Sequence, residues 1–381
     1  KLGKGLALIK TLAILKSMNA TILPNEFTVR HSIRPDVGRE FLSWDISGWD
    51  EVKKLVKKVG EVLAQFKPDI VHAHNLHLHL SYASLVEAKK YAKGVFLTVH
   101  DSMPFHYSKL FPETIGAVDG NVKSYKVSPW IQFRLFKTGF NPFRNKIIKK
   151  YLEIPTKIFA VSNALAKALG DNGIQNVEVL HNGIDVTEWE VPASSEIHDK
   201  NFIFFGGRLS AVKGGGILIE AVKDVLKQRS NTRLLVVGEK NEFADEMERE
   251  AQTLGVDDLI YFTGKRSHDE MKGLYPLSSV VVVPSLCFDW FPTVILEAMA
   301  CKKPVIATCF GGAKEMVVDG TTGYIINPLN QVELTDSILN LLKNPRRIVE
   351  MGEAGYERVK AEFSMDKHLS KLLAWYDKTL R

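Results

Sequence analysis

Short apolar runs alternate with helix-forming segments through the second half of the chain, and this alternation limits the folds that it can adopt. The runs are FIFF (202–205), LLVV (234–237), LIYF (259–262), VVVV (280–283) and VIAT (305–308). Apolar runs without polar alternation indicate strands buried on both faces, as in a parallel sheet covered by helices. We therefore predict a doubly wound α/β domain, which would bind ligands at the carboxyl ends of its strands.

The first half of the chain has the same pattern. DIVHAH (69–74), GVFLTVHD (94–101) and KIFAVS (157–162) read as strands with helix-forming segments between them. A chain of 381 residues also exceeds what one core comfortably fills. We predict two Rossmann-like domains, at residues 1–184 and 185–363, and a last helix at 364–381 that packs back toward the first domain.

The first residues of the chain have an apolar stripe at helical spacing. It consists of Leu6, Ile9, Leu12, Ala13 and Leu15. This spacing predicts a surface helix, followed by a short strand at 20–24. Because a doubly wound domain normally begins with a strand and a tight glycine turn, we expect that first strand and its Gly-rich loop to be missing.

Two carboxylates stand out between the strands at 280–283 and 305–308. Asp289 lies in a loop, and Glu297 follows eight positions later in a helix-forming run. Both are expected at the carboxyl edge of the parallel sheet. The pair alone leaves hydrolysis, metal binding and nucleotide binding open.

A glycine turn after the strand at 202–205 brings two cations to the same edge. Arg208 follows Gly206 and Gly207, and Lys213 precedes a glycine triplet that begins a helix. Free N–H groups at a helix N-terminus and two positive charges favour an anion. The pattern is neither Walker A nor GxGxxG, so a purely structural glycine turn is an equal alternative.

Histidines and cysteines give little support to a metal site. His72, His74, His77 and His79 have spacings of two, three and two, which match no common zinc motif. We expect His72 and His74 to form hydrogen bonds at a strand end, and His77 and His79 to lie in a loop or at the surface. The three cysteines form no CxxC pair, which disfavours a disulfide framework and fits a cytoplasmic protein.

Residues 102–150 mix aromatic and basic side chains. The aromatic residues are Trp130, Phe133, Phe136, Phe140 and Phe143, and the bases are Arg134, Lys137, Arg144, Lys146, Lys149 and Lys150. One interpretation is a connecting helix pair that packs its aromatic residues inward. The other is an amphipathic surface, at 130–150, that meets an anionic membrane. The formal net charge of +6 and the lack of a motif disfavour nucleic acid.

Several motifs together resemble glycosyltransferase family 4, the retaining nucleotide-sugar enzymes of GT-B architecture. They are TVHD (98–101), FAVS (159–162), HNGID (181–185), GGRLSAVKG (206–214), DWFPTVILEAMA (289–300) and GGAKEMVVDGTTG (311–323). They follow the order of the family along nearly the whole chain. The resemblance implies that the two domains face each other across a cleft and that the donor is a UDP- or GDP-sugar, with no metal and no cofactor.

The resemblance also implies roles for particular residues. Arg208 and Lys213 would hold the donor diphosphate, Glu297 the ribose hydroxyls and Asp289, where the family usually has Glu, the donor sugar. His100 would approach the sugar from the first domain, with Ser162 as a minor contact. The remaining donor-binding residues would be Phe291 and Thr293, through their backbone N–H groups, and Pro292, Gly207, Gly264 and Arg266.

The implied reaction is transfer of the sugar to an acceptor hydroxyl of a glycan, lipid or small molecule, with retention at the anomeric carbon. Two alternatives stay open at this point. One is a nucleotide-sugar epimerase of the same architecture, and the other is an inactive binding or scaffold protein. The expected location is the cytoplasm, with peripheral contact at the inner membrane face.

Overall fold

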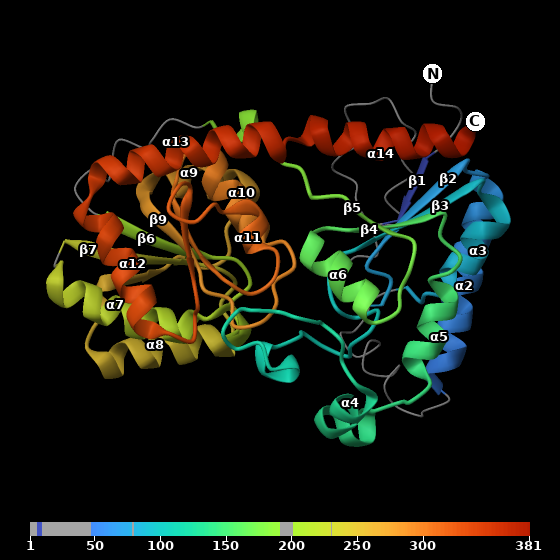
Figure 1. The fold of residues 1–381 in the computed structure, drawn as a ribbon, viewed down its shortest axis with the longest axis horizontal. Coiled ribbons are helices and arrows are strands. Elements are labelled where there is room, and N and C mark those ends of the chain that lie inside the picture. The colour runs from blue at the N-terminus through green and yellow to red at the C-terminus, as the bar shows by residue number, and fades with distance from the viewer. Residues whose placement is uncertain (1–5, 10–46, 78–79, 191–200, 230) are drawn as a thin grey trace. The chain divides into compact units, whose positions relative to one another are not determined.

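The computed structural model describes residues 6–9, 47–77, 80–190, 201–229 and 231–381. They form two compact units, each built on one parallel sheet (Figure 1). The first unit takes the residues up to Leu110, 123–180 and 370–381, and the second takes 111–122 and 181–369. No helix among the described residues combines the length and hydrophobicity that a membrane crossing requires.

The sheet of the first unit has five parallel strands in the order β1-β2-β3-β4-β5. They are β1 (Leu6–Ile9), β2 (Ile70–His74), β3 (Gly94–Val99), β4 (Lys157–Ala160) and β5 (Val177–Val179). All six residues of β3 are buried, as its run of apolar residues predicts for an inner parallel strand.

The beginning of the chain differs from the sequence prediction. Leu6–Ile9 form a strand that pairs in parallel with β2, with Leu6 opposite Ile70, so the predicted helix is wrong there. The predicted absence of a first strand is also wrong, because β1 precedes β2 in the chain and extends the same sheet. A four-residue apolar run fits helix and strand equally, and here the exposed edge of β2 decides. The strand predicted at 20–24 lies outside the described residues.

Among the described residues, six α-helices belong wholly or partly to the first unit. They are α2 (Ser47–Phe66), α3 (Ser84–Tyr91), α4 (Pro129–Phe136), α5 (Arg144–Tyr151), α6 (Asn163–Asp171) and, from Ser370 onward, α14 (Met365–Leu380). Leu372 and Tyr376 of α14 join a buried cluster with Ile70, Phe96 and Phe159 from three strands. Burial against these strands is what fixes the end of the chain to this sheet.

The aromatic residues of α4 and α5 do not all pack inward. Phe136 stacks on Tyr107, but Trp130, Phe133 and Phe143 are exposed. The interpretation of residues 102–150 as a helix pair with inward-facing aromatic residues is therefore wrong for these three side chains.

The sheet of the second unit has six parallel strands in the order β11-β10-β9-β6-β7-β8. They are β6 (Asn201–Gly206), β7 (Thr232–Val237), β8 (Ile260–Phe262), β9 (Ser278–Val283), β10 (Val305–Thr308) and β11 (Gly323–Ile326). The chain starts at β6, proceeds through β7 and β8, and then returns to place β9 on the other side of β6. The order therefore reverses between β6 and β9, and such a switch point opens a crevice at the carboxyl ends of the strands.

Helices cover both faces of this sheet. They are α7 (Gly215–Gln228), α8 (Glu242–Leu254), α9 (His268–Leu274), α10 (Thr293–Ala300), α11 (Ala313–Met316), α12 (Gln331–Lys343) and α13 (Pro345–Glu362). In Figure 1, α7, α8 and α12 lie on one face, and α10 and α13 on the other. A continuous core joins Ile203 and Val280 of the strands to Leu218 of α7 and Ile338 of α12. This packing holds the loops after β6 and β9 in place.

All three cysteines belong to this second unit. Cys287, Cys301 and Cys309 are buried, and none of them forms a disulfide. Burial raises the pKa of Cys301 to about 12 and that of Cys309 to about 11. Each of these two thiols is therefore protonated at neutral pH and a poor nucleophile.

Candidate functional site

The loops that follow β6 and β9 touch each other at the switch point. The backbone N–H of Leu286 donates to the carbonyl of Val212 at 2.8 Å. Gly214 has φ +79°, and a Cβ there would lie 2.1 Å from the carbonyl oxygen of Pro284. Glycine is therefore required at this position both by its backbone conformation and by the close approach of the second loop.

An ion pair joins the two loops. The ammonium of Lys213 binds Oδ2 of Asp289, and the Ser285 hydroxyl donates to the same oxygen at 3.2 Å. The Asp289 side chain is 13% exposed and that of Lys213 is 28% exposed, so both are shielded but reachable. The structure thus brings together two predicted site residues that are far apart in the sequence, and it adds Ser285, which the sequence did not indicate.

Arg208 lies in the same loop as Lys213 but in a different environment. Its side chain is exposed, and it pairs with no carboxylate among the described residues. Its positive charge is therefore available to an anionic ligand. Gly207, which precedes it, has φ +123° and donates its N–H to the carbonyl of Val237 at 2.9 Å.

Two helices begin at this edge of the sheet without a side-chain cap. The N-cap of α7 is Gly214 and that of α10 is Pro292, and neither offers a side-chain acceptor. In contrast, asparagine or serine caps α8, α9 and α12. The N-termini of α11 and α13 also lack such caps. Uncapped N–H groups and the helix dipoles of α7 and α10 add positive potential beside Arg208 and Lys213.

Glu297 forms a hydrogen bond with a side chain of the core. The hydroxyl of Tyr275, a fully buried residue, donates to its Oε2 at 2.6 Å. Burial raises the pKa of Glu297, and the hydrogen bond from Tyr275, the nearby His268 and a bond from Thr293 oppose that rise. No sequence pattern indicated Tyr275, because a tyrosine at the end of a helix usually packs without any role in a site.

The segment between the two carboxylates is anchored rather than mobile. The N–H of Gly312 donates to the carbonyl of Asp289 at 2.8 Å, and Gly311 has φ +85°. The Phe291 ring is buried and stacks on His181 with centroids 5.4 Å apart. Phe291 and Pro292 are therefore buried parts of the scaffold, whereas Thr293 is exposed at the start of α10.

Gly264 and Arg266 follow β8 on the other side of the switch point. The carbonyl of Gly264, whose φ is +72°, accepts from the N–H of Gly238 at 3.2 Å. Arg266 is exposed and pairs with Glu270 at 3.2 Å. Glu270 also completes the capping box of α9 with Ser267, and bonds from Ser267 and Arg266 lower its pKa to about 2. A ligand that recruits Arg266 would have to compete with this carboxylate.

His100 lies in the first unit, just after β3. Its Nε2 is 3.0 Å from Nδ1 of His74, and its backbone N–H donates to the side-chain oxygen of Asn75 at 3.3 Å. His72 lies 2.6 Å from the Tyr376 hydroxyl and 2.7 Å from that of Thr98. The predicted hydrogen bonds of His72 and His74 are confirmed, but only His74 lies at the end of β2, because His72 is buried in the middle of that strand.

His77 follows β2 in a loop, as predicted, but it is not a surface residue. Its side chain is 7% exposed and lies 3.2 Å from Asp101. Burial opposes the ionisation of Asp101, yet His77 and the N–H of Met103 outweigh it and lower the pKa of this carboxyl. His79 lies outside the described residues.

Ser162 is fully buried, and its hydroxyl accepts from the N–H of Leu165 at 3.1 Å as the cap of α6. This contact gives Ser162 a structural role. Within the described part of the chain, no three His, Cys, Asp or Glu side chains are grouped as metal ligands would be.

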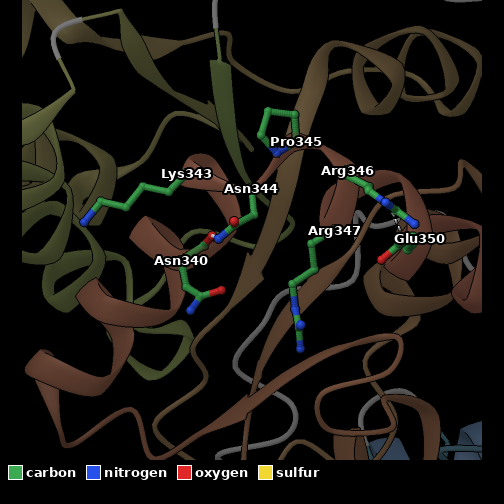
Figure 2. Close-up of a pocket in the computed structure, with 7 residues that line it drawn as sticks. All are labelled: Asn340, Lys343, Asn344, Pro345, Arg346, Arg347 and Glu350. Carbon is green, nitrogen blue, oxygen red and sulfur yellow. Dashed lines mark hydrogen bonds and ion pairs between the residues drawn. The ribbon is translucent and has the colours of Figure 1, made fainter.

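A separate pocket of about 460 Å³ lies where α12 meets α13 (Figure 2). Its lining is Asn340, Lys343, Asn344, Pro345, Arg346, Arg347 and Glu350. None of the predicted site residues contributes to it. Arg346 is already paired with Glu350 at 2.7 Å, as the dashed line in Figure 2 shows.

Comparison with known proteins identifies the two halves of the chain. Residues 23–188 match the family model Glycosyltransferase Family 4, and residues 187–358 match Glycosyl transferases group 1. One curated relative is the lipopolysaccharide 1,2-N-acetylglucosaminetransferase of Salmonella typhimurium, 31% identical over 47% of this chain and 50% of its own length. The chain spans about half to three-fifths of the length of the first curated relatives that it matches.

Solved structures share the fold. Sucrose-phosphate synthase from Thermosynechococcus elongatus has a TM-score of 0.67 with 20% identity, over 87% of this chain and 78% of its own. Anabaena HepE, in complex with UDP and glucose, has a TM-score of 0.65 with 19% identity, over 84% of this chain and 80% of its own. The chain therefore belongs to the glycosyltransferases that join a family 4 domain to a group 1 domain, and its two Rossmann-like domains are those of the GT-B architecture.

Proposed function

We propose that the protein is a retaining glycosyltransferase, which moves a sugar from a nucleotide diphosphate sugar to an acceptor hydroxyl. The observation that carries this proposal is the pairing of Lys213 with Asp289 at the switch point of the second sheet. A cation for phosphate and a carboxylate for hydroxyl groups lie side by side there. The UDP and glucose bound to Anabaena HepE, a protein of the same fold, support the choice of donor.

The donor diphosphate would bind between the two loops. Arg208 and Lys213 supply positive charge, and the uncapped N-termini of α7 and α10 supply N–H groups. We propose that these groups neutralise the phosphates without a divalent metal or a cofactor. In the proposed complex, the Lys213 ammonium moves from Asp289 to the phosphate, so donor binding exchanges one ion pair for another.

The two carboxylates would bind hydroxyl groups of the donor. Once Lys213 has moved to phosphate, Asp289 can accept from hydroxyls of the sugar while Ser285 keeps its Oδ2 in place. Glu297, oriented by Tyr275, would accept from the ribose hydroxyls. A carboxylate suits this role because it can accept from two adjacent O–H groups. Both are thus proposed as binding residues and not as acid/base catalysts.

In the proposed reaction, the bond between the anomeric carbon and the phosphate oxygen breaks. The acceptor oxygen bonds to the same face of that carbon, and the leaving phosphate takes the proton of the acceptor. Arg208 and Lys213 stabilise the negative charge that develops on the phosphate. His100 keeps the role proposed from its motif, a hydrogen bond to the donor sugar.

Product analysis with a panel of UDP- and GDP-sugars and acceptors tests the proposal. We expect release of free nucleotide together with a product whose anomeric configuration, read by NMR, equals that of the donor. Addition of EDTA is expected to leave the rate unchanged. An inverted product would refute retention, and a rate lost in EDTA and restored by Mg²⁺ would refute metal independence.

Lys213→Ala gives the sharper test, with Lys227→Ala as the matched control. Lys227 is exposed in the same unit and pairs with Asp224. We expect turnover to fall about 10³-fold in Lys213→Ala and to stay at the wild-type value in the control, with both variants folded by circular dichroism. Wild-type turnover in Lys213→Ala would refute the assignment of this site. Contact with a membrane is a separate proposal, because it rests on the first unit and not on the donor site.

A further inference from the structure

Helix α4 has its polar and apolar residues in an unusual arrangement. In its sequence PWIQFRLF, the buried residue is Gln132, whose side-chain amide donates to the carbonyl of Phe105 at 3.2 Å. Trp130, Phe133 and Leu135 are exposed, at 64, 48 and 52%. A surface helix of a soluble protein normally does the opposite and turns its apolar side to the core. The outward face of α4 is therefore shaped for contact with something apolar.

The same exposure continues beyond α4. Phe143, just before α5, is 58% exposed, and Ile147 in α5 is 40% exposed. Trp130, Phe133 and Phe143 are the exposed tryptophan and phenylalanine residues of the whole described chain. The rings of Trp130 and Phe133 stack with centroids 5.7 Å apart. The exposed tryptophan and phenylalanine side chains are thus gathered in one segment, whereas the exposed tyrosines, Tyr91 and Tyr261, lie elsewhere.

The charged residues of this segment of the sequence are all of one sign. Residues 120–152 contain eight lysines and arginines and no aspartate or glutamate. The Arg144 guanidinium points away from this surface. It lies over the Tyr107 ring, 4.6 Å from the centroid, and donates to the carbonyl of Met103 at 2.7 Å. The exposed cations near the aromatic residues are Lys126, Arg134, Lys137, Lys146 and Lys150.

We propose that the exposed side chains of residues 130–150, the α4–α5 surface, dock this protein on an anionic phospholipid bilayer. Tryptophan and phenylalanine partition into the boundary between headgroups and acyl chains, while lysine and arginine meet the lipid phosphates. Nucleic acid would use the cations but would leave Leu135 and Ile147 exposed to water. In Figure 1, α4 lies at the end of its unit away from the sheet.

Sedimentation with vesicles tests this docking directly. The full chain is mixed with vesicles of phosphatidylcholine alone or of phosphatidylcholine with phosphatidylglycerol. We expect binding to the anionic vesicles to be at least about 100-fold stronger and to weaken with added NaCl. Equal binding to both vesicles, or binding to neither, would overturn the proposal.

Two independent sets of substitutions separate the aromatic and the charged contributions. We expect Trp130→Ala/Phe133→Ala/Phe143→Ala and Lys146→Glu/Lys150→Glu each to reduce binding to anionic vesicles about 10-fold or more. Val332→Ala/Val349→Ala, at two valines that are 68 and 62% exposed in the second unit, is the matched control and should bind as the wild type does. Wild-type binding by both test variants would refute the assignment of this surface.

Other occupants of the surface would give different results. Self-association of the wild type that the triple aromatic substitution abolishes, without vesicle binding, would show an interface between copies of the chain. Binding to DNA or RNA without vesicle binding would show a nucleic-acid surface. Either outcome would overturn the proposal. Lipids brominated in their acyl chains add a positional test: they should quench tryptophan fluorescence in the wild type and do so less in Trp130→Phe, which keeps an aromatic ring.

Discussion

Helices α4 and α10 are both eight residues long and largely apolar, yet α10 buries its apolar side chains whereas α4 buries a polar one. In α10, Ile295, Leu296, Ala298, Met299 and Ala300 are buried, and Glu297 reaches Tyr275. In α4, the buried residue is Gln132, and the aromatic residues face outward. The difference shows that composition alone does not decide which face a short helix buries. The sheet beneath α10 needs an apolar cover, whereas α4 is anchored through the polar contact of Gln132 with Phe105.

The surroundings of the two helices differ in the same way. Near α10, the ammonium of Lys213 pairs with Asp289, Arg208 lies in the same loop as Lys213, and Glu297 belongs to the helix itself. Around α4 and α5, cations occur without carboxylates in the sequence from 120 to 152. Mixed charges suit a small ligand that carries both phosphate and hydroxyl groups, and a single sign suits an extended anionic surface.

The largest expected contrast between the two helices is in stability. Ile295→Ala removes a side chain with no exposed surface and should lower the free energy of unfolding by about 3 kcal/mol. Phe133→Ala, at 48% exposure, should change it by less than about 1 kcal/mol. Urea titrations of both variants measure the two values. Equal losses would mean that Phe133 is packed, and the comparison would fail.

The second contrast concerns the cations. Lys213→Ala should weaken UDP binding about 30-fold, or about 2 kcal/mol, because it removes a charge-assisted bond to phosphate. Lys146→Ala, which removes an equal charge from the α4–α5 surface, should leave UDP binding unchanged. Calorimetry with UDP checks both variants. A similar loss in both would indicate that only the overall charge matters, and not the position of Lys213.

A third prediction concerns pH. In the proposed donor site, the carboxylate form of Glu297 accepts from ribose. Burial raises the pKa of this group, so UDP affinity should fall on acidification as Glu297 gains a proton. Tyr275→Phe removes a hydrogen bond that lowers this pKa. In that variant, the loss of UDP affinity on acidification should therefore begin at a higher pH. Affinity should be about 10-fold weaker at the acid end in the wild type, and Glu297→Gln should abolish this dependence. An unchanged pH dependence in Glu297→Gln would assign the titration to another group.

The smallest effect is expected at Ser285. Ser285→Ala removes the hydrogen bond that positions the Asp289 carboxylate but touches no donor atom itself, so it should weaken donor binding only a few-fold, or by about 1 kcal/mol. Ser124→Ala is the counterpart in the first unit, since its hydroxyl donates to Asp171 at 3.2 Å. Donor binding should not respond to Ser124→Ala. Titration with UDP-sugar compares the two, and a response to Ser124→Ala alone would contradict the role given to Ser285.

Part of the fold and of the site could be read from the sequence. Continuous apolar runs predicted the strands β6, β7 and β9, because strands buried on both faces have no polar alternation. Since loops after neighbouring parallel strands meet at one edge, Lys213 and Asp289 could also be expected near each other. Their direct ion pair could not, because it depends on the path of both loops around Gly214.

Other features depended on contacts that no local pattern records. Tyr275 reaches Glu297 only because its helix ends beneath α10. The apolar residues of Leu6–Ile9 have helical spacing in the sequence, but in the structure this segment pairs with the edge of β2 and forms a strand. The outward direction of Trp130 and Phe133 follows from the inward direction of Gln132, and no periodicity in PWIQFRLF distinguishes these two faces.

The three buried cysteines have a practical consequence. Thiols that are shielded from solvent, two of them with raised pKa values, react slowly with maleimides and other alkylating reagents. The native chain thus provides an almost unreactive background for site-directed labelling. A fluorophore or spin label attached to an introduced cysteine, such as Phe143→Cys, would report from that position alone, without prior replacement of Cys287, Cys301 or Cys309.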